Sequence, residues 1–564
     1  MRFNQLEINP AKNPAVLDTA TWDPAHAWEQ VKALGADDWQ ALQEAAASRS
    51  PWPANPRLAQ YPASEASYQG VSYGLAGLPD GQSVFLGTGP VQATDVLGQP
   101  LGRLQLSAAF QVSAYPADAA TLDRYFRHIR PDKGPRPLGA VPRLGIGTRM
   151  TTAVWPGIWQ AMAAGHFAAN AIQNSVRELN LLDDLLAARP AEKNIAFNFG
   201  EIESGYTGST FEGLWTAGVL YALQSDPPLA YGADADHLQV KRGPDGMARA
   251  RRLAAAARYY SFFTLDVSDV LDYRALVGVN GVNPSLAGAA GVDSTPLQAK
   301  YRLALDAVEE LFNTLRQLKG DTPFDLELSI DEHPPAVNTF DCLTSPEELR
   351  FVLHELQRRR VPLTHVAPNL GVQKGTDYRG PDGLPGLEAR TRALFRLSQD
   401  QGVMLDVHSG DDLGADTRRA LQRATGGQLH FKISPQLQLL FAEVLADFHP
   451  QLFQRWWDSA LAYARREAAA GSAFAAGCLR QTEEANSPSL PLRVSRPIGT
   501  PKRVGGSAHD SLFHHFSFPF VGQRDAAGQF IRREEFYTLS PAFYAAYQER
   551  VSRYLQELAS ELFE

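Results

Sequence analysis

Histidine and carboxylate side chains recur at the ends of short apolar runs in this sequence. The runs end as GADADH at residues 232–237, TLDVSD at 264–269, SIDEH at 329–333 and DVHSG at 406–410. A fifth run reads HFK at residues 430–432. Imidazole and carboxylate groups placed in this way typically ligate a metal, transfer protons, or do both.

Three histidines, His237, His408 and His430, belong to three different runs of this kind. A single histidine is more often a helix cap or a surface residue, but three at such positions favour a metal site. Imidazole ligands suit Zn, Mn, Ni, Co or Fe better than Mg or Ca. We therefore predict one divalent metal of the first group.

The other polar residues of these runs leave alternatives open. Asp331 and Glu332 are either a general acid or base or solvated charges, and Asp236 is either a partner of a metal-binding imidazole or a helix cap. Lys432 is a Schiff-base nucleophile, a clamp for a carboxylate or oxyanion, or an ion-pair partner inside a barrel. The ion pair is the commonest role for such a lysine.

Several function classes lose support. The sequence lacks a His-Glu-x-x-His helix, a phosphate-binding Gly-x-x-x-x-Gly-Lys loop, a Gly-x-Gly-x-x-Gly turn and a Gly-x-Ser-x-Gly elbow. Serine hydrolases, P-loop NTPases and nicotinamide dehydrogenases are therefore disfavoured. With 53 Lys and Arg against 62 Asp and Glu, the net charge is −9. That sign argues against nucleic acid and anionic membranes as partners.

Composition also bounds the environment of the chain. The 564 residues are 44% hydrophobic and 20% charged, as in globular proteins, and include two distant cysteines, Cys342 and Cys478. Neither a disulfide framework nor a zinc ribbon is expected. The N-terminus has no apolar signal core and no run reaches about 18 apolar residues. The expectation is a cytoplasmic protein that does not enter membranes.

The elements that must position these residues alternate between short β-rich runs and longer helical patterns. The expected strands are 143–148, 168–173, 229–237, 262–267, 324–331, 363–370, 403–410 and 429–434. The expected helices are 155–165, 176–188 with 214–224, 248–260, 297–318, 347–360, 387–399, 416–424 and 437–447. A capping box, Ser345 to Glu348, precedes the helix near residue 347. Eight strand–helix units predict an α/β fold, a (β/α)8 TIM-type barrel, with a doubly wound sheet as the alternative.

A proline-rich segment, PDKGPRPLGAVP at 131–142, divides the chain. It predicts a small N-terminal α+β appendage at 1–135, with strands near 83–86 and 104–109 and a helix near 118–130 capped by Asp118. The catalytic barrel is expected at 143–450. A C-terminal helical extension, including a helix at 541–558, is expected at 451–564.

The polar strand ends resemble those of the tagaturonate/fructuronate epimerase family, metal-dependent enzymes of bacterial hexuronate catabolism. The matching strings are QNSVRE at 173–178, GADADH at 232–237, FTLD with SD at 263–269, IDE at 330–332, KGTDYRG at 374–380, HSG at 408–410 and ATGG at 424–427. They precede His430 and Lys432, and their order is the family's order. The resemblance covers roughly residues 140–440 and thins toward LFH at 512–514.

The resemblance implies a barrel with a divalent metal on His237, His408 and His430. It implies proton transfer by Glu332, with Asp266 and Lys432 as further catalytic candidates. The implied substrate-binding residues are Arg149, Arg177, Gln173, Lys374, Asp377, Tyr378 and Ser409. Cations such as Arg149 and Arg177 suit a substrate carboxylate.

The chain departs from the family at one position of interest. Where the family has Gly-x-Gly-Asp-Arg-Leu, residues 145–150 read GIGTRM, so Thr148 replaces an aspartate. A threonine hydroxyl has no pKa suited to proton transfer. The fold and metal site are therefore expected to carry over more closely than the substrate.

The leading hypothesis is a metal-dependent epimerase of a keto-sugar acid or ketohexose, working by retro-aldol cleavage or a transient hydride shift. A Schiff-base aldolase or lyase using Lys432 is the second hypothesis, and a catalytically silent sugar-binding homologue is the third. The expected partner is a small sugar or sugar acid. The sequence leaves the metal's identity and the oligomeric state open, a homo-oligomer included.

Overall fold

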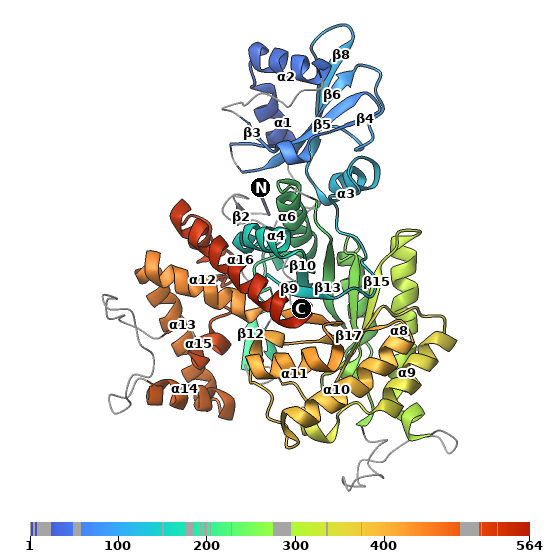
Figure 1. The fold of residues 1–564 in the computed structure, drawn as a ribbon. Coiled ribbons are helices and arrows are strands. Elements are labelled where there is room, and N and C mark those ends of the chain that lie inside the picture. The colour runs from blue at the N-terminus through green and yellow to red at the C-terminus, as the bar shows by residue number, and fades with distance from the viewer. Residues whose placement is uncertain are drawn as a thin grey trace.

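The fold is that of a computed structural model. It describes the chain except residues 1, 4–5, 8–23, 49–57, 80, 149–151, 176–183, 186, 192, 197–199, 204, 227, 274–294, 334–336, 374, 486–506, 509 and 527. Figure 1 shows a central barrel, a sheet-containing lobe at one end in blue and a group of helices in orange to red at its side.

Eight parallel strands close into a barrel, which confirms the predicted fold class. They are β9 (Arg143–Gly147), β10 (Ala168–Ser175), β13 (Tyr231–Gln239), β14 (Phe262–Asp266), β15 (Asp325–Ile330), β16 (His365–Pro368), β17 (Met404–Val407) and β18 (His430–Ile433). Each coincides with one of the eight predicted runs. Strand β18 pairs with β9, which completes the ring.

The barrel helices follow their strands along the chain. They are α4 (Trp155–Gly165), α6 (Phe211–Leu223), α7 (Gly246–Ala256), α8 (Pro296–Lys319), α9 (Pro346–Arg358), α10 (Gly383–Asp400), α11 (Ala415–Thr425) and α12 (Pro435–Phe448). The predicted capping box is present at α9, where the Ser345 side chain and the Glu348 side chain each accept a backbone N–H bond from the other residue. Between β10 and α6 lies a small antiparallel pair, β11 (Lys193–Ala196) and β12 (Gly200–Glu203).

The N-terminal lobe holds an antiparallel sheet with strand order β3-β5-β6-β8-β7. Its strands are β3 (Ala59–Gln60), β4 (Ala66–Tyr68), β5 (Val71–Gly77), β6 (Ser83–Pro90), β7 (Gly102–Gln105) and β8 (Phe110–Pro116). Helices α1 (Pro24–Lys32) and α2 (Ala36–Ser48) pack on one face with a core of their own. Helix α3 (Ala119–His128) begins at Asp118, whose side chain accepts from the Thr121 N–H, as predicted. Strands β1 (Arg2–Phe3) and β2 (Leu6–Glu7) form a separate pair.

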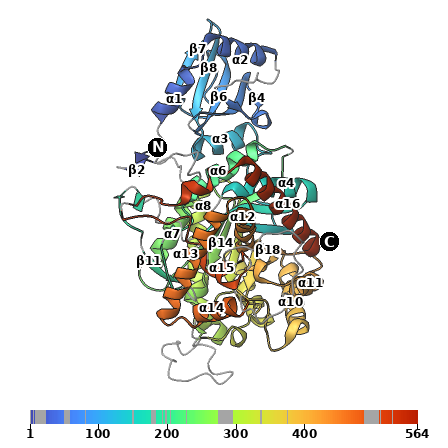
Figure 2. The ribbon, with the colours of Figure 1, turned by 90° about the vertical axis from the view of Figure 1, so that its left-hand side faces the viewer.

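The proline-rich linker crosses the N-terminal end of the barrel strands. The backbone N–H groups of Leu138 and Gly139 donate to the Asp325 carboxylate at the start of β15. The Arg136 N–H donates to the carbonyl of Tyr231 at the start of β13. The N-terminal lobe is thus tied to the end of the barrel opposite the strand ends where polar residues gather, and Figure 2 shows it as a distinct lobe.

Helices after the barrel pack along its side. They are α13 (Pro450–Ala469), α14 (Ala473–Ala485), α15 (Ser511–Phe516) and α16 (Pro541–Phe563). Helix α16 lies along α4 and α12, which joins the C-terminus to the start of the barrel (Figure 1). No helix in the described part of the chain is long and apolar enough to span a bilayer.

The interior of the barrel is unusually polar. Branched apolar residues normally fill a TIM barrel, but the strands here bury Asn170, Asp234, Glu327, His365 and Asp406, each at most 1% exposed. Buried charges are costly unless they are paired. The contacts of these groups with one another therefore determine what the barrel can bind.

Candidate functional site at the C-terminal end of the barrel

His237 and His408 face each other at the C-terminal end of the barrel. Their ring centroids lie 5.1 Å apart with the rings nearly perpendicular. The register of β13 against β14 shifts between Ala235 and Leu238, so His237 lies in a β-bulge, and its φ of 56° is in the left-handed region. Ser409, next to His408, has the same unusual φ of 56°. Strained backbone at His237 and at Ser409 is typical of functional positions.

The imidazole of His408 lies between two carboxylates. Its Nε2 lies 2.6 Å from Oε1 of Glu327, and its Nδ1 lies 3.1 Å from Oδ2 of Asp331. Burial disfavours the imidazolium, but the charges of Asp331 and Glu327 outweigh it and raise the pKa of His408 well above its usual value. Without a metal, His408 is therefore a cation.

His237 has a similar arrangement on the opposite wall. Its Nδ1 lies 3.2 Å from Oδ2 of Asp266, and its Nε2 lies 3.8 Å from Oδ2 of Asp236. Burial again opposes the charge, and Asp236 and Asp266 raise the pKa of His237 above its ordinary value. Asp266 also accepts the Ser268 N–H, so the structure uses its carboxylate to orient His237.

Lys432, on β18 at the level of His408, is 3% exposed. Its ammonium is 2.6 Å from Glu327, 2.9 Å from Asp236 and 3.1 Å from Asp234, and it also donates to Thr264. Burial lowers the pKa of a lysine, but here these carboxylates reverse the effect and raise it well above the usual value. A permanently charged amine is no nucleophile, so the ion-pair role of Lys432 is the one the geometry supports.

The predicted set of three histidines does not assemble. His430 is the first residue of β18, whereas His408 follows the last residue of β17. Because the strands are parallel, His430 lies deeper in the barrel, level with Asp406, and its Nδ1 is 2.8 Å from Oδ2 of that residue. The three histidines named from the sequence therefore lie at two levels of the barrel, His237 and His408 at one and His430 at the other.

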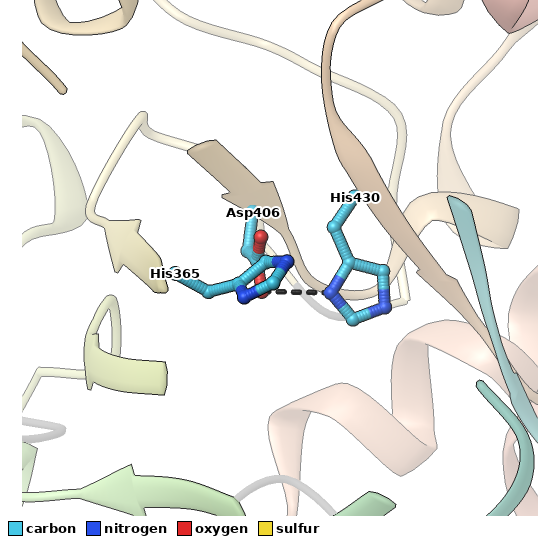
Figure 3. Close-up of side chains that lie close together, drawn as sticks. All are labelled: His365, Asp406 and His430. Carbon is cyan, nitrogen blue, oxygen red and sulfur yellow. Dashed lines mark hydrogen bonds and ion pairs between the residues drawn. The ribbon is translucent and has the colours of Figure 1, made fainter. Parts of the chain in front are cut away.

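A different group gathers around His430. One ligand atom each from His365, Asp406 and His430 lie within 4.8 Å of one another, and all three residues are buried, so together they could hold a metal ion (Figure 3). Burial is the main cause that lowers the pKa values of His365 and His430 well below the usual value, so both imidazoles are neutral. The charge of Lys432 acts in the same direction on both.

The catalytic candidate Glu332 and the substrate-binding candidate Gln173 adjoin carboxylates that contact His408 and His237. The Glu332 N–H lies 3.3 Å from Oγ of Ser268, beside Asp331. Gln173 is buried, and its amide donates to Asp236 at 3.0 Å. Thr148, at the end of β9, is 4% exposed.

Two expected substrate-binding residues make contacts within the scaffold. Asp377 accepts hydrogen bonds from the Gly414 N–H and the Thr417 hydroxyl at the start of α11. The Tyr378 hydroxyl contacts Asp382 at 2.6 Å and is 9% exposed. Three further candidates, Arg149, Arg177 and Lys374, lie outside the described residues.

Sequence reasoning missed Glu327, His365 and Asp406. Glu327 and His365 lie away from the C-terminal strand ends where we looked for chemistry, and Asp406 stands in the run DVHSG but was given no role. One signal was present: β15 reads DLELSI, with polar residues at every second position of an otherwise apolar run. A charge with the two-residue period of a strand interior indicates a polar barrel core.

A polar cavity of about 620 Å³ opens beside this site. It borders the loop that follows His408 and lies under α14 and α15 of the C-terminal extension. Its polar lining includes Thr376, Arg379, Asp412, Gln436 and His514. Asp412 contacts Nε2 of His514 at 3.0 Å, which ties the C-terminal extension to the barrel rim.

Comparisons with known proteins agree with this architecture. Residues 293–472 match the family model described as UxaE, tagaturonate epimerase. No curated protein sequence matches this chain.

Among solved structures, a glycerol complex of fructuronate-tagaturonate epimerase UxaE from Cohnella laeviribosi is 20% identical. It aligns over 92% of this chain and 99% of its own, with a TM-score of 0.58. The native structure of that epimerase is 18% identical, aligns over 94% and 99%, and gives 0.59. At this identity the likeness establishes a shared fold. Together with the matched segment it confirms the resemblance read from the sequence, a similarity to the tagaturonate epimerase family at low sequence identity.

Proposed function

We propose that the protein is a metal-dependent epimerase of a keto-sugar acid of the tagaturonate or fructuronate type. The observation that supports this most directly is the family match over residues 293–472. That segment includes β15 to β18 and therefore supplies Glu327, Asp331, His408 and Lys432 to the site.

The two facing histidines fit a divalent metal. In metal sites, a ligating imidazole typically donates its other N–H to a carboxylate, which fixes the tautomer. Here Glu327 would take the Nε2 proton of His408 and Asp266 the Nδ1 proton of His237, which leaves one nitrogen of each ring for an ion. Asp331 and Asp236, beside those nitrogens, would add oxygen ligands. This donor set suits Zn, Mn, Ni, Co or Fe.

The proposed chemistry follows from the substrates. Tagaturonate and fructuronate differ at the carbon β to the ketone, where simple enolisation does not act. Removal of the proton from the β hydroxyl breaks the α–β carbon bond, and re-addition to the other face of the aldehyde inverts that carbon. A divalent ion supplies Lewis-acid stabilisation of the enediolate oxygens. Glu332, adjacent to Asp331, is the proposed group for the hydroxyl proton, and the competing route is a transient hydride shift.

Two observations weigh on the alternatives. The three carboxylates around Lys432 disfavour a Schiff-base aldolase. Thr148 in place of the family's aspartate is the observation that favours a silent sugar-binding homologue.

The test is proton NMR of metal-loaded protein with tagaturonate, fructuronate and neutral ketohexoses in D2O. We expect interconversion of the two uronates with the hydrogen on the inverted carbon retained, because neither proposed route exchanges it. His237→Gln and His408→Gln should abolish turnover, whereas His354→Gln, on exposed α9 surface, should not. Metal binding without turnover of any of these sugars would instead indicate the silent homologue.

A further inference from the structure

A second group of metal ligands lies deep in the barrel, away from His237 and His408. His365 begins β16, His430 begins β18, and Asp406 comes from the intervening β17 (Figure 3). Their ligand atoms lie within 4.8 Å of one another. Ligands bound at about 2.0–2.1 Å to one tetrahedral ion are roughly 3.3 Å apart. Small side-chain movements would therefore bring the three donors onto a single ion.

Each imidazole of the group keeps one unbonded nitrogen in the described structure. Nε2 of His365 and Nε2 of His430 are buried and have no hydrogen-bond partner, but Nε2 of His430 points toward Gly145 and away from Asp406, so His365 is the residue that offers the group an unbonded nitrogen. His365 uses its other nitrogen on the Thr364 hydroxyl at 2.8 Å, and His430 uses its other nitrogen on Asp406. Buried polar atoms nearly always have a partner, and an unbonded one indicates a missing water or ion.

Asp406 is the barrel carboxylate that the two buried basic side chains leave to a histidine. Arg143 pairs with Asp325 at 3.1 Å, and Lys432 pairs with Asp234, Asp236 and Glu327. Among the described ion pairs, the one that Asp406 makes is with the imidazole of His430. A divalent cation at this group would give the Asp406 carboxylate a charged partner.

The group is closed at both ends, so an ion there would not meet substrate. His365 and His430 are 0% exposed and Asp406 is 1% exposed. Below them, Arg143 and Asp325 bind the linker residues that cross the barrel. Phe262 packs edge-on against both imidazoles, at 4.8 Å and 5.4 Å.

We propose that His365, Asp406 and His430 bind a second, non-catalytic divalent metal ion that stabilises the end of the barrel at which its strands begin. Two imidazoles and one carboxylate select an ion of the Zn, Co, Ni, Fe or Mn group and disfavour Mg and Ca. The site does not depend on the proposed epimerase activity. Its burial predicts slow exchange, since the ion cannot leave without local opening of the barrel.

The test is the metal content of the full-length protein grown and purified with Zn²⁺, by elemental mass spectrometry, and anomalous diffraction at the zinc edge. We expect two ions per chain and two anomalous peaks. His365→Gln and Asp406→Asn should each lose one ion and unfold at lower temperature, while His237→Gln should lose the other ion. His354→Gln should keep both. EDTA should remove the ion at His237 and His408 at least about tenfold faster than it removes the buried ion at His365, Asp406 and His430.

Each outcome decides between the two sites. If the wild-type protein binds one ion, and the His365→Gln variant loses it while the His237→Gln variant keeps it, the buried site is supported and the proposed catalytic metal is contradicted. If instead the His237→Gln variant loses that ion and the His365→Gln variant keeps it, the buried site is overturned. An anomalous map of the wild-type protein with no peak between His365, Asp406 and His430 would also overturn it. The diffraction result does not depend on any variant folding.

Discussion

Glu327 contacts both His408 and the buried Lys432. Its Oε1 lies 2.6 Å from Nε2 of His408, and its Oε2 lies 2.6 Å from Nζ of Lys432. A single carboxylate, 0% exposed, thus fixes the orientation of the proposed metal ligand His408 and pairs with the positive charge of Lys432. This makes Glu327 a positioning residue, which acts on substrate only through His408.

Glu327→Gln should weaken metal binding at His237 and His408 about 10- to 100-fold, the usual loss when the partner of a metal-binding imidazole is removed. The measurement is competition for Zn²⁺ with a chromophoric chelator. Glu348→Gln is the matched control, because Glu348 is also a buried carboxylate paired with a lysine, Lys300, but lies outside the barrel interior. Equal metal affinity in the Glu327→Gln and Glu348→Gln variants would contradict the positioning role.

Lys432 should behave as a structural cation. Lys432→Met leaves Asp234, Asp236 and Glu327 without their shared partner, and breaking a buried ion pair typically costs about 3–5 kcal/mol of unfolding free energy. Urea denaturation of wild-type and variant protein measures this loss.

Borohydride should trap no substrate on the wild-type enzyme, because the carboxylates raise the pKa of Lys432 and keep it protonated. A borohydride-stable adduct on Lys432 would restore the aldolase hypothesis.

The metal-free protein should become less stable as pH rises above 7. Carboxylates raise the folded pKa of His408 well above 6.5, so its stabilising charge is complete below 6.5 and is lost as pH rises through the folded value. Asp234 acts in the same direction at the lower end of the range, because burial raises its pKa to about 7 and its contribution is lost as pH rises through that value. Unfolding free energy in EDTA, measured from pH 6 to 9, should fall with pH.

The metal-loaded protein provides the contrast for this experiment. Metal binding needs the neutral imidazole, so bound Zn²⁺ should remove or reverse the decline over the same pH range. His408→Gln should flatten the decline in the metal-free protein, while His354→Gln, an exposed histidine, should not. A decline that persists unchanged in His408→Gln would assign the titration to another group.

The sequence was sufficient for the fold because the barrel repeats a strong local signal. Each predicted run became a strand, and the Ser345–Glu348 box begins α9 as expected. Periodicity and caps are local properties, and they survive packing. The site was harder, because depth along a strand is not a local property: His430 and His408 both adjoin apolar runs, yet they lie at different levels of the barrel.

Glu327 and Asp406 could not be ranked from sequence for a related reason. A buried acidic residue in a strand is recognisable only through its partners. The partner of Glu327 is Lys432, about a hundred residues further along the chain, and the partner of Asp406 is His430, on the next strand. Only the closed barrel brings them together. The residues that orient the ligands therefore appeared with the structure, whereas His237 and His408 could be named beforehand.

Glu332 is the remaining test of the proposed reaction. Proton transfer from a substrate hydroxyl needs a base near the reacting atoms, and Thr148 supplies no titratable group in this range. The backbone of Glu332 is fixed between Ser268 and Tyr273, next to Asp331, which contacts His408. A carboxylate close to a divalent cation stays ionised and is suited to accept a proton. Glu332→Gln keeps the shape of the side chain and removes its charge.

We expect Glu332→Gln to bind metal as the wild-type protein does, while turnover of the uronates falls at least about 100-fold, the usual loss for a positioned acid or base. Glu347→Gln, on the exposed first turn of α9, is the control and should change neither quantity. The readouts are metal content and initial rates by NMR. Turnover within a few-fold of wild type would remove Glu332 from the mechanism, because an essential proton acceptor cannot be replaced by an amide, and would direct attention to Asp236, the other carboxylate beside His237.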